Sequence, residues 1–210
     1  MKTVLNKRNI DQLRNPMFFG EDLSLQRYDL IKYPKFYDLY DQQLNFFWRP
    51  QEVSLVKDIS DYKNLSPEER FVFDSNLKFQ TMTDSMLSRS IHELMKHCTN
   101  SELEICMNTW SFFETSIHSK SYSHIIRNIY GVPKEEFNKI HDTSEIAGMA
   151  ANIGRYYEDL HTLNCRKELG ETISIHDHKR AIWLALHASY ALEAFRFMVS
   201  FATSLAMVEN

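Results

Sequence analysis

The sequence predicts an all-α protein, and three observations support that prediction. The 210 residues include only five glycines and five prolines, whereas the usual glycine share of roughly 7% would give about fifteen. So few chain-breaking residues disfavour arrays of β-turns and glycine-rich phosphate loops. Apolar residues make up 43% of the chain and aromatic residues 13%, which is enough to build a core and argues against disorder. Long helices are the structure that remains.

Five helices are expected, and most have start or stop signals. Ser66 to Glu69 (Ser-Pro-Glu-Glu) form a capping box with proline at the first helical position. Ser101 to Glu104 form a second capping box, and Gly131 followed by Pro133 ends the helix begun there. After an irregular segment 1–33, the expected helices span residues 34–48, 66–97, 101–131, 144–169 and about 178 to the end of the chain.

The last expected helix is apolar almost all round from Ala181 to Val208, which is typical of a central, buried helix. It has no glycine or proline stop before Asn210. Four other helices do not supply enough cover for a central helix. We therefore expect an incomplete bundle, in which further C-terminal helices are missing.

Charge and hydropathy exclude several classes of partner. The formal charge is −4, so the chain lacks the positive field of a nucleic-acid binder. The N-terminus has no secretory apolar core, and the longest uncharged run, 197–208, is too short to span a bilayer. We expect a cytoplasmic protein that binds neither nucleic acid nor membrane.

The cysteines and most histidines predict no separate site. Cys98, Cys106 and Cys165 are odd in number and form no CxxC pair, so a reducing compartment fits better than a disulfide framework. His176 and His178 lie in a polar turn before the last helix and are expected to be solvated.

Carboxylates lie on the apolar faces of two expected helices. Asp84 shares a stripe with Leu77, and Glu193 shares one with Phe197. A carboxylate in an apolar stripe is costly unless something compensates its charge. The plainest compensation is a buried cationic partner, such as Arg196 or Arg127 for Glu193.

A third helix carries a carboxylate, an imidazole and a phenol together. Glu114, His118 and Tyr122 follow one another at i+4 on a face that also contains Trp110. Two ligands one turn apart can reach the same metal ion, although a hydrogen-bond network without metal would also explain the face. Because three helices bring acids to one core, a bound cation is the more economical explanation. One imidazole among carboxylates favours iron or manganese over zinc or copper.

Six stretches of the chain carry a family resemblance. They are NPMFFG (15–20), QRYD (26–29), NFFWRPQEV (45–53), SNLKFQTMTDSMLSRS (75–90), TWSFFETSIHSKSYSHIIRN (109–128) and ALEAFRFMVSFATS (191–204). In these stretches the sequence resembles the small, radical-generating subunit of class I ribonucleotide reductase, particularly the enterobacterial and T-even-phage type. The resemblance implies a ferritin-like helical bundle, of which residues 34–210 would form a part.

The resemblance also implies a di-iron centre. Asp84, Glu114 and His118 would ligate the first iron, and Glu193 would serve the second, with Glu114 bridging the two. The family's next helix supplies another Glu and His, but no second E-x-x-H occurs in this sequence. Four of the six expected ligands are therefore present.

Further roles follow from the same resemblance. Tyr122 would be the radical tyrosine, and Phe197 and Phe201 would form part of the dry pocket that protects the radical. Trp48 would carry the electron toward the large subunit. In the family, iron and dioxygen oxidise the tyrosine, and the radical then travels to the catalytic subunit to start reduction of ribonucleotides.

One departure from the family pattern concerns the ligands themselves. The family has Glu and His three residues apart, whereas Glu114 and His118 are four apart. In a straight helix the inserted residue would rotate one ligand by about 100°. We hypothesise that a π-bulge between the two residues absorbs it.

Three functions are consistent with these patterns. The first is a small subunit of ribonucleoside-diphosphate reductase, or the N-terminal half of a split one. Its partners would be the large catalytic subunit and either a second copy or a complementary C-terminal small-subunit polypeptide. The second is a non-catalytic truncated remnant that acts as an interaction module. The third, an iron-storing or oxygen-activating ferritin-like protein, ranks last because it predicts a second E-x-x-H and leaves Trp48 unexplained.

Overall fold

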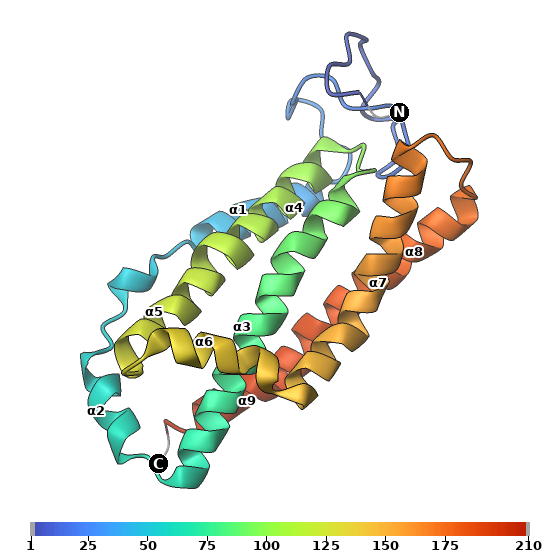
Figure 1. Ribbon diagram of the computed structural model, residues 1–210. Helices are drawn as coiled ribbons and strands as arrows, with labels where there is room; N and C mark the ends of the chain where they lie inside the picture. Colours follow the sequence, from blue (N-terminus) through green and yellow to red (C-terminus); the bar gives the residue numbers. More distant parts are fainter. Residues whose placement is uncertain (1–2, 209–210) are drawn as a thin grey trace.

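The long helix α3 (Pro67–Met95) forms the centre of the bundle. The computed structural model describes residues 3–208. Around α3 pack α4 (Ser101–Phe113), α5 (Ser119–Ile129), α7 (Ser144–Glu168) and α9 (Phe197–Ala206) (Figure 1). The capping box predicted at Ser66 is confirmed: Ser66 Oγ accepts the N–H of Glu69 at 3.2 Å, and the Glu69 carboxylate accepts the N–H of Ser66 at 2.8 Å.

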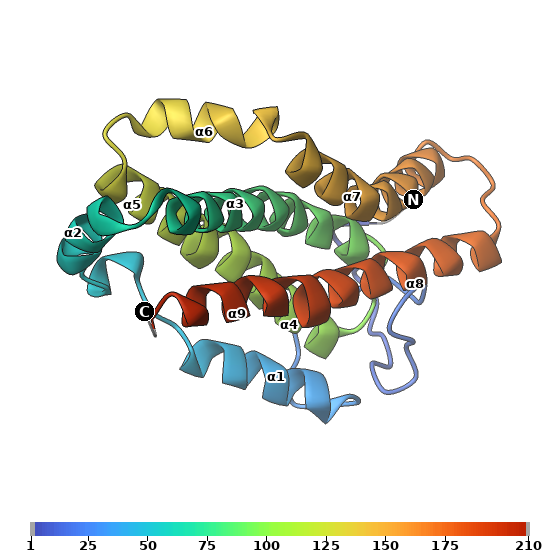
Figure 2. The ribbon, with the colours of Figure 1, turned by 90° about the horizontal axis from the view of Figure 1, so that it is seen from below.

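Two long helical segments of the bundle, which we call rods, each consist of two α-helices joined end to end through a π turn. The first is α4, the π segment η2 (Glu114–His118) and α5. The second is α8 (Ile175–Ala191), the π segment η3 (Leu192–Arg196) and α9. In Figure 2 the second rod crosses the bundle between α1 (Pro34–Asn45) and α3. Both rods pack against α3, which brings the two π segments to the same core.

Several expected boundaries are wrong. α1 ends at Asn45, so Trp48 lies outside it. Pro133 begins the helix α6 (Pro133–Asp142) instead of merely following a stop, because proline fits the first turn of a helix. Two further short elements were not expected, namely the 3₁₀ turn Pro50–Glu52 and the helix α2 (Val56–Asn64).

A buried carboxylate anchors the N-terminal segment to the bundle. Residues 3–33 contain no helix and lie over one end of the bundle (Figure 1). Glu102 is 1% exposed; its Oε1 accepts the N–H groups of Lys32 at 2.5 Å and Tyr33 at 3.0 Å. The expected capping box at Ser101 is wrong, because Asn100 caps α4 by accepting the N–H of Leu103. The division at residue 33 stays a prediction.

The last helix is not the central one. α8 and α9 bury one side against α3 and α7 and expose large apolar side chains on the rest of their surface. We call this exposed set the α8–α9 apolar surface; it consists of Trp183, Leu186, Tyr190, Met198, Val199, Phe201 and Leu205. High apolarity predicted burial, but nothing among residues 3–208 covers these side chains. No helix in this range is long and apolar enough to cross a membrane.

Candidate metal centre

The extra residue between Glu114 and His118 is absorbed by a π turn. The N–H of Ser119 donates to the carbonyl of Glu114, five residues earlier, and the Ser119 hydroxyl donates to the same carbonyl at 2.8 Å. The π-bulge hypothesis is therefore confirmed. Such single π turns occur often at functional sites, because they turn side chains away from the regular helical positions.

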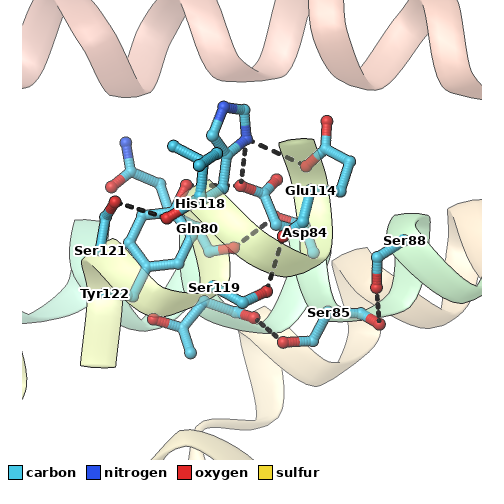
Figure 3. Close-up of polar contacts among 12 residues, drawn as sticks. Gln80, Asp84, Ser85, Ser88, Glu114, His118, Ser119, Ser121 and Tyr122 are labelled. Atoms are coloured by element: carbon cyan, nitrogen blue, oxygen red, sulfur yellow. Dashed lines mark hydrogen bonds and ion pairs between the residues drawn. The ribbon is translucent and has the colours of Figure 1, made fainter. Parts of the chain in front are cut away.

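The π turn brings two residues of η2 to a residue of α3. Asp84, Glu114 and His118 each place one potential ligand atom within 4.8 Å of the others (Figure 3). His118 Nδ1 lies 3.0 Å from Glu114 Oε2 and 3.4 Å from Asp84 Oδ2. The two carboxylates are buried, whereas His118 is part-exposed. This is the kind of donor set, oxygen-rich with one imidazole, that iron and manganese accept.

Glu193 approaches the same charges from the other rod. It belongs to the π segment η3, in which the N–H of Phe197 donates to the carbonyl of Leu192. Burial, followed by the charges of Glu114 and Asp84, raises the pKa of Glu193 to about 8. Sequence reasoning did not anticipate this second π turn. Both rods thus carry their candidate ligands on π turns.

The charges of the cluster are compensated within it only in part. Burial favours the neutral form of His118, but its hydrogen bonds to Asp84 and Glu114 and their charges outweigh this and raise its pKa to about 10. Burial raises the pKa of Glu114, against the opposing effect of His118. A single imidazolium thus faces three acids.

No lysine or arginine in the described part of the chain supplies the missing positive charge. Among residues 3–208, no Lys or Arg forms an ion pair with Asp84, Glu114 or Glu193. Arg196, one of the partners considered for Glu193, instead donates to the carbonyl of Met149 at 3.0 Å.

Two buried carboxylate oxygens test whether a metal fits this cluster. Asp84 Oδ1 and Glu193 Oε1 are both inaccessible and have no hydrogen-bond partner in the described part of the chain. A buried acceptor without a partner is costly. A cation held by Asp84, Glu114 and His118 would give Asp84 Oδ1 a partner, so these three residues fit a metal ion. Glu193 is not part of the group whose ligand atoms lie within 4.8 Å of one another in the described part of the chain.

Tyr122 lies directly beside the cluster (Figure 3). Its hydroxyl donates to Asp84 Oδ2 at 2.5 Å, and burial together with the Asp84 charge raises its pKa well above the ordinary value. Trp110 Nε1–H donates to Glu114 Oε1 at 3.0 Å. Sequence reasoning placed Trp110 on this face but missed the contact, although its i+4 spacing to Glu114 was the available signal.

The other predicted site residues differ in how far they are buried. Phe197 is buried, with its ring centroid 5.8 Å from that of Phe79, whereas the stacked ring of Phe201 is half-exposed. Trp48 is part-buried and lies in the segment that links α1 to the 3₁₀ turn. Its neighbour Phe47 packs on Phe113, the residue before Glu114.

A histidine expected to be solvated is fully buried. His178 lies in α8 with 0% exposure, and its Nε2 pairs with Asn164 Oδ1 at 2.7 Å. Its ring packs edge-on against the rings of His97 and Phe19. The polar neighbours of His178 in sequence concealed this burial, because its cover comes from distant segments.

Comparisons with known proteins agree on one family. The family model described as "Ribonucleotide reductase, small chain" matches residues 27–210. Ribonucleoside-diphosphate reductase beta subunits of Buchnera aphidicola, Escherichia coli O157:H7 and phage T4 are 44%, 41% and 36% identical to the chain. These alignments cover 99–100% of the chain but only 58–59% of each relative.

Solved structures agree on the fold. A ribonucleotide reductase R2 subunit from Clostridium botulinum matches with a TM-score of 0.82 at 24% identity, over 99% of this chain and 62% of that one. A dimanganese(II) protein from Streptococcus sanguinis matches with a TM-score of 0.58 at 22% identity, over 62% of this chain and 47% of that one. The predicted ferritin-like, partial helical bundle is confirmed.

Proposed function

Because the chain belongs to the small-chain family of ribonucleotide reductases, we propose that it provides the radical-generating site of a ribonucleoside-diphosphate reductase. The observation that supports this most is the cluster of Asp84, Glu114 and His118 beside the buried phenol of Tyr122. It joins a place for a metal ion to an oxidisable side chain.

In this proposal, four side chains hold the metal. Asp84, Glu114 and His118 would hold one iron ion, and Glu193 and Glu114 would hold a second. The two open oxygens, Asp84 Oδ1 and Glu193 Oε1, are positions for a cation. When bound, ferrous iron would activate dioxygen, and dioxygen would supply the oxidising equivalent that converts Tyr122 to a phenoxyl radical.

The protein's own residues protect and position that phenol. Tyr122 gives its hydrogen bond to Asp84 Oδ2, so its proton has an acceptor in place when the electron leaves. Phe197, 4% exposed, helps keep water from the site. Trp48 would pass the electron outward, from a segment held against α4 through the contact of Phe47 with Phe113.

The α8–α9 apolar surface indicates how the site is completed. Large apolar side chains that are exposed together are typical of protein-interaction sites, and this surface lies on the same rod as Glu193. The chain spans about 58% of the length of its curated relatives. We propose that a helical polypeptide equivalent to their remaining part covers this surface and adds the missing ligands, and that a second copy and the large catalytic subunit are further partners.

The same surface favours one alternative function. A non-catalytic chain that only binds other small subunits would use the α8–α9 apolar surface without needing the metal cluster. In that case substitution of the three carboxylates or of the His118 imidazole would not change the amount of iron that the chain binds.

Iron binding separates these proposals. The chain is loaded anaerobically with Fe(II), alone and coexpressed with the C-terminal part of the Escherichia coli relative, and iron per chain is measured. We expect at most one iron alone and two in the complex, with the second lost in Glu193→Ala. Absence of bound iron from both preparations would contradict the proposed function and favour the interaction module.

A further inference from the structure

A pair of tyrosines bonded to one carboxylate lies where α2 and α5 meet the beginning of α3 (Figure 1). Asp74 of α3 accepts hydrogen bonds from two phenols. Tyr130 Oη donates to Asp74 Oδ1 at 2.5 Å, and Tyr62 Oη donates to the same oxygen at 3.0 Å. The two tyrosine rings pack edge to face, with centroids 5.3 Å apart. None of the three residues belongs to the candidate metal centre.

We propose that Tyr130, with Asp74 and Tyr62, forms a second site of proton-coupled oxidation, which takes up an oxidising equivalent from Tyr122. The choice of the Tyr122 phenoxyl as the oxidant rests on the proposed function. The hydrogen-bonded geometry of Tyr130, Tyr62 and Asp74 is independent of that function, because it involves none of the candidate metal ligands.

The step balances with the groups that are in place. Tyr130 loses one electron, and its O–H bond breaks as the proton moves to Asp74 Oδ1, where a new O–H bond forms. The electron passes to the phenoxyl of Tyr122, whose oxygen regains the proton that its own oxidation released. The products are a Tyr130 phenoxyl, a neutral Asp74 carboxyl and an intact Tyr122 phenol.

The position of Tyr130 favours this transfer. Tyr122, Ile126 and Tyr130 follow one another at i+4 along α5 and its end, so the Cα atoms of the two tyrosines are about 12 Å apart along the helix axis. Ile126 between them is 3% exposed, so the helix face that joins the two tyrosines is buried at this position. The path leads away from the metal cluster toward the other end of the bundle.

The protonation states also suit the transfer. Burial and the charge of Asp74 raise the pKa of Tyr62 to about 12. Burial and the hydrogen bond to Asp74 raise the pKa of Tyr130 above its ordinary value. Both phenols therefore keep their protons at neutral pH, and the proton is available to leave with the electron.

Two neighbouring features complete the site. The guanidinium of Arg70 lies 5.0 Å from the centroid of the Tyr62 ring and donates to the carbonyl of Tyr62 at 3.2 Å. A cavity of about 400 Å³ opens beside the cluster, lined by Leu65, Pro67, Arg70, Phe71 and Asp74. This cavity gives Asp74 a route by which a received proton reaches solvent.

Flash oxidation of the metal-free protein tests the site without relying on the metal centre. A photogenerated ruthenium(III) polypyridyl complex serves as the oxidant, and phenoxyl absorption is followed at several concentrations of phosphate buffer. The Tyr122→Phe background removes the one further phenol that is bonded to a carboxylate among residues 3–208. Tyr37→Phe is the matched control, because Tyr37 also packs on tyrosine rings but has no carboxylate partner among residues 3–208.

We expect a fast phenoxyl phase whose rate does not depend on phosphate, because Asp74 is the built-in base. Asp74→Asn should make this phase phosphate-dependent, the double change Tyr62→Phe and Tyr130→Phe should abolish it, and Tyr37→Phe should leave it intact. A fast phase that is absent, or is unchanged by Asp74→Asn, would overturn the proposal.

A second measurement needs no variant that risks unfolding. In the unmodified chain, with Tyr122 present, a nitroso spin trap is added after the flash and the adducts are located by peptide mass spectrometry. Adducts on the peptides of Tyr130 or Tyr62 support the site. Adducts confined to other tyrosines overturn it, whatever the metal-loading experiments show.

Discussion

The hydroxyl of Tyr122 and the Oδ2 atom of Asp84 are joined by a 2.5 Å hydrogen bond between α5 and α3. The same oxygen lies 3.4 Å from His118 Nδ1, whereas the other carboxylate oxygen, Oδ1, is buried without a hydrogen-bond partner among residues 3–208. Asp84 therefore has two distinct sides. One side holds the phenol and the imidazole, and the other is open to a cation.

Trp110 should affect metal binding without being a ligand. Its indole N–H holds Glu114 Oε1 at 3.0 Å, and loss of such a supporting hydrogen bond typically weakens metal affinity about 10- to 100-fold. We expect Trp110→Phe to reduce Fe(II) affinity by that factor, measured by anaerobic competition with a chelator. Trp183→Phe, a change on the exposed surface, serves as the control, and equal affinities for the two variants would contradict the role of Trp110.

The π turn predicts which deletions the chain tolerates. Removal of Ser116 should convert η2 into a regular α turn while residues on both sides keep their positions, because a π turn is an α-helix with one extra residue. Removal of the exposed Asn108 from α4 should instead rotate Trp110 and Glu114 by about 100°. The midpoint of thermal unfolding and the Fe(II) affinity are measured for both variants. We expect the deletion of Ser116 to preserve both quantities and the deletion of Asn108 to lower both. Loss of both in the two deletions alike would refute it.

His178 should make the protein less stable in mild acid. Burial and the charge of Lys167 lower its pKa, so the native state takes up this proton less readily than the unfolded state. Stability is fully present above the unfolded pKa of about 6.5 and falls below it, by up to about 1.4 kcal/mol per pH unit.

Urea unfolding at about pH 7.5 and about pH 5.5 measures the effect. The loss of stability should be smaller in His178→Gln than in the control His176→Gln, whose imidazole is exposed. The same loss in both variants would show that His178 does not cause the pH dependence.

Positive charges introduced on the α8–α9 apolar surface should weaken binding of the partner polypeptide and leave the free energy of unfolding nearly unchanged. Met198 and Val199 are 57% and 70% exposed, so changing both to Lys should alter the free energy of unfolding by only about 0.5 kcal/mol each. Binding of the C-terminal part of the relative should weaken at least tenfold, as measured by copurification and titration. Leu169→Lys, at another exposed site, is the control, and undiminished binding of the double variant would place the partner elsewhere.

Local signals explain what could be predicted from the sequence. The capping residues at Ser66 and the i+4 series Glu114, His118 and Tyr122 act within one or two turns, so spacing alone identifies them. The π turn at η2 was predictable because the spacing of its ligands departs from the family pattern. The one at η3 was not, because no departure in spacing marks Glu193.

Features that depend on distant segments were missed. His178 is buried by Phe19 and His97, which no local pattern around His178 reveals. The α8–α9 rod has the composition of a buried helix, but burial also requires a neighbour, and composition does not show whether one is present.

The central claim is that this chain holds a metal site whose product is a radical on Tyr122. The most direct test is the electron paramagnetic resonance spectrum after anaerobic Fe(II) loading and exposure to air, recorded for the chain coexpressed with the C-terminal part of its relative. We predict a tyrosyl radical that disappears in Tyr122→Phe while iron remains bound. Two irons per chain without any radical, or a radical that persists in Tyr122→Phe, would contradict the claim.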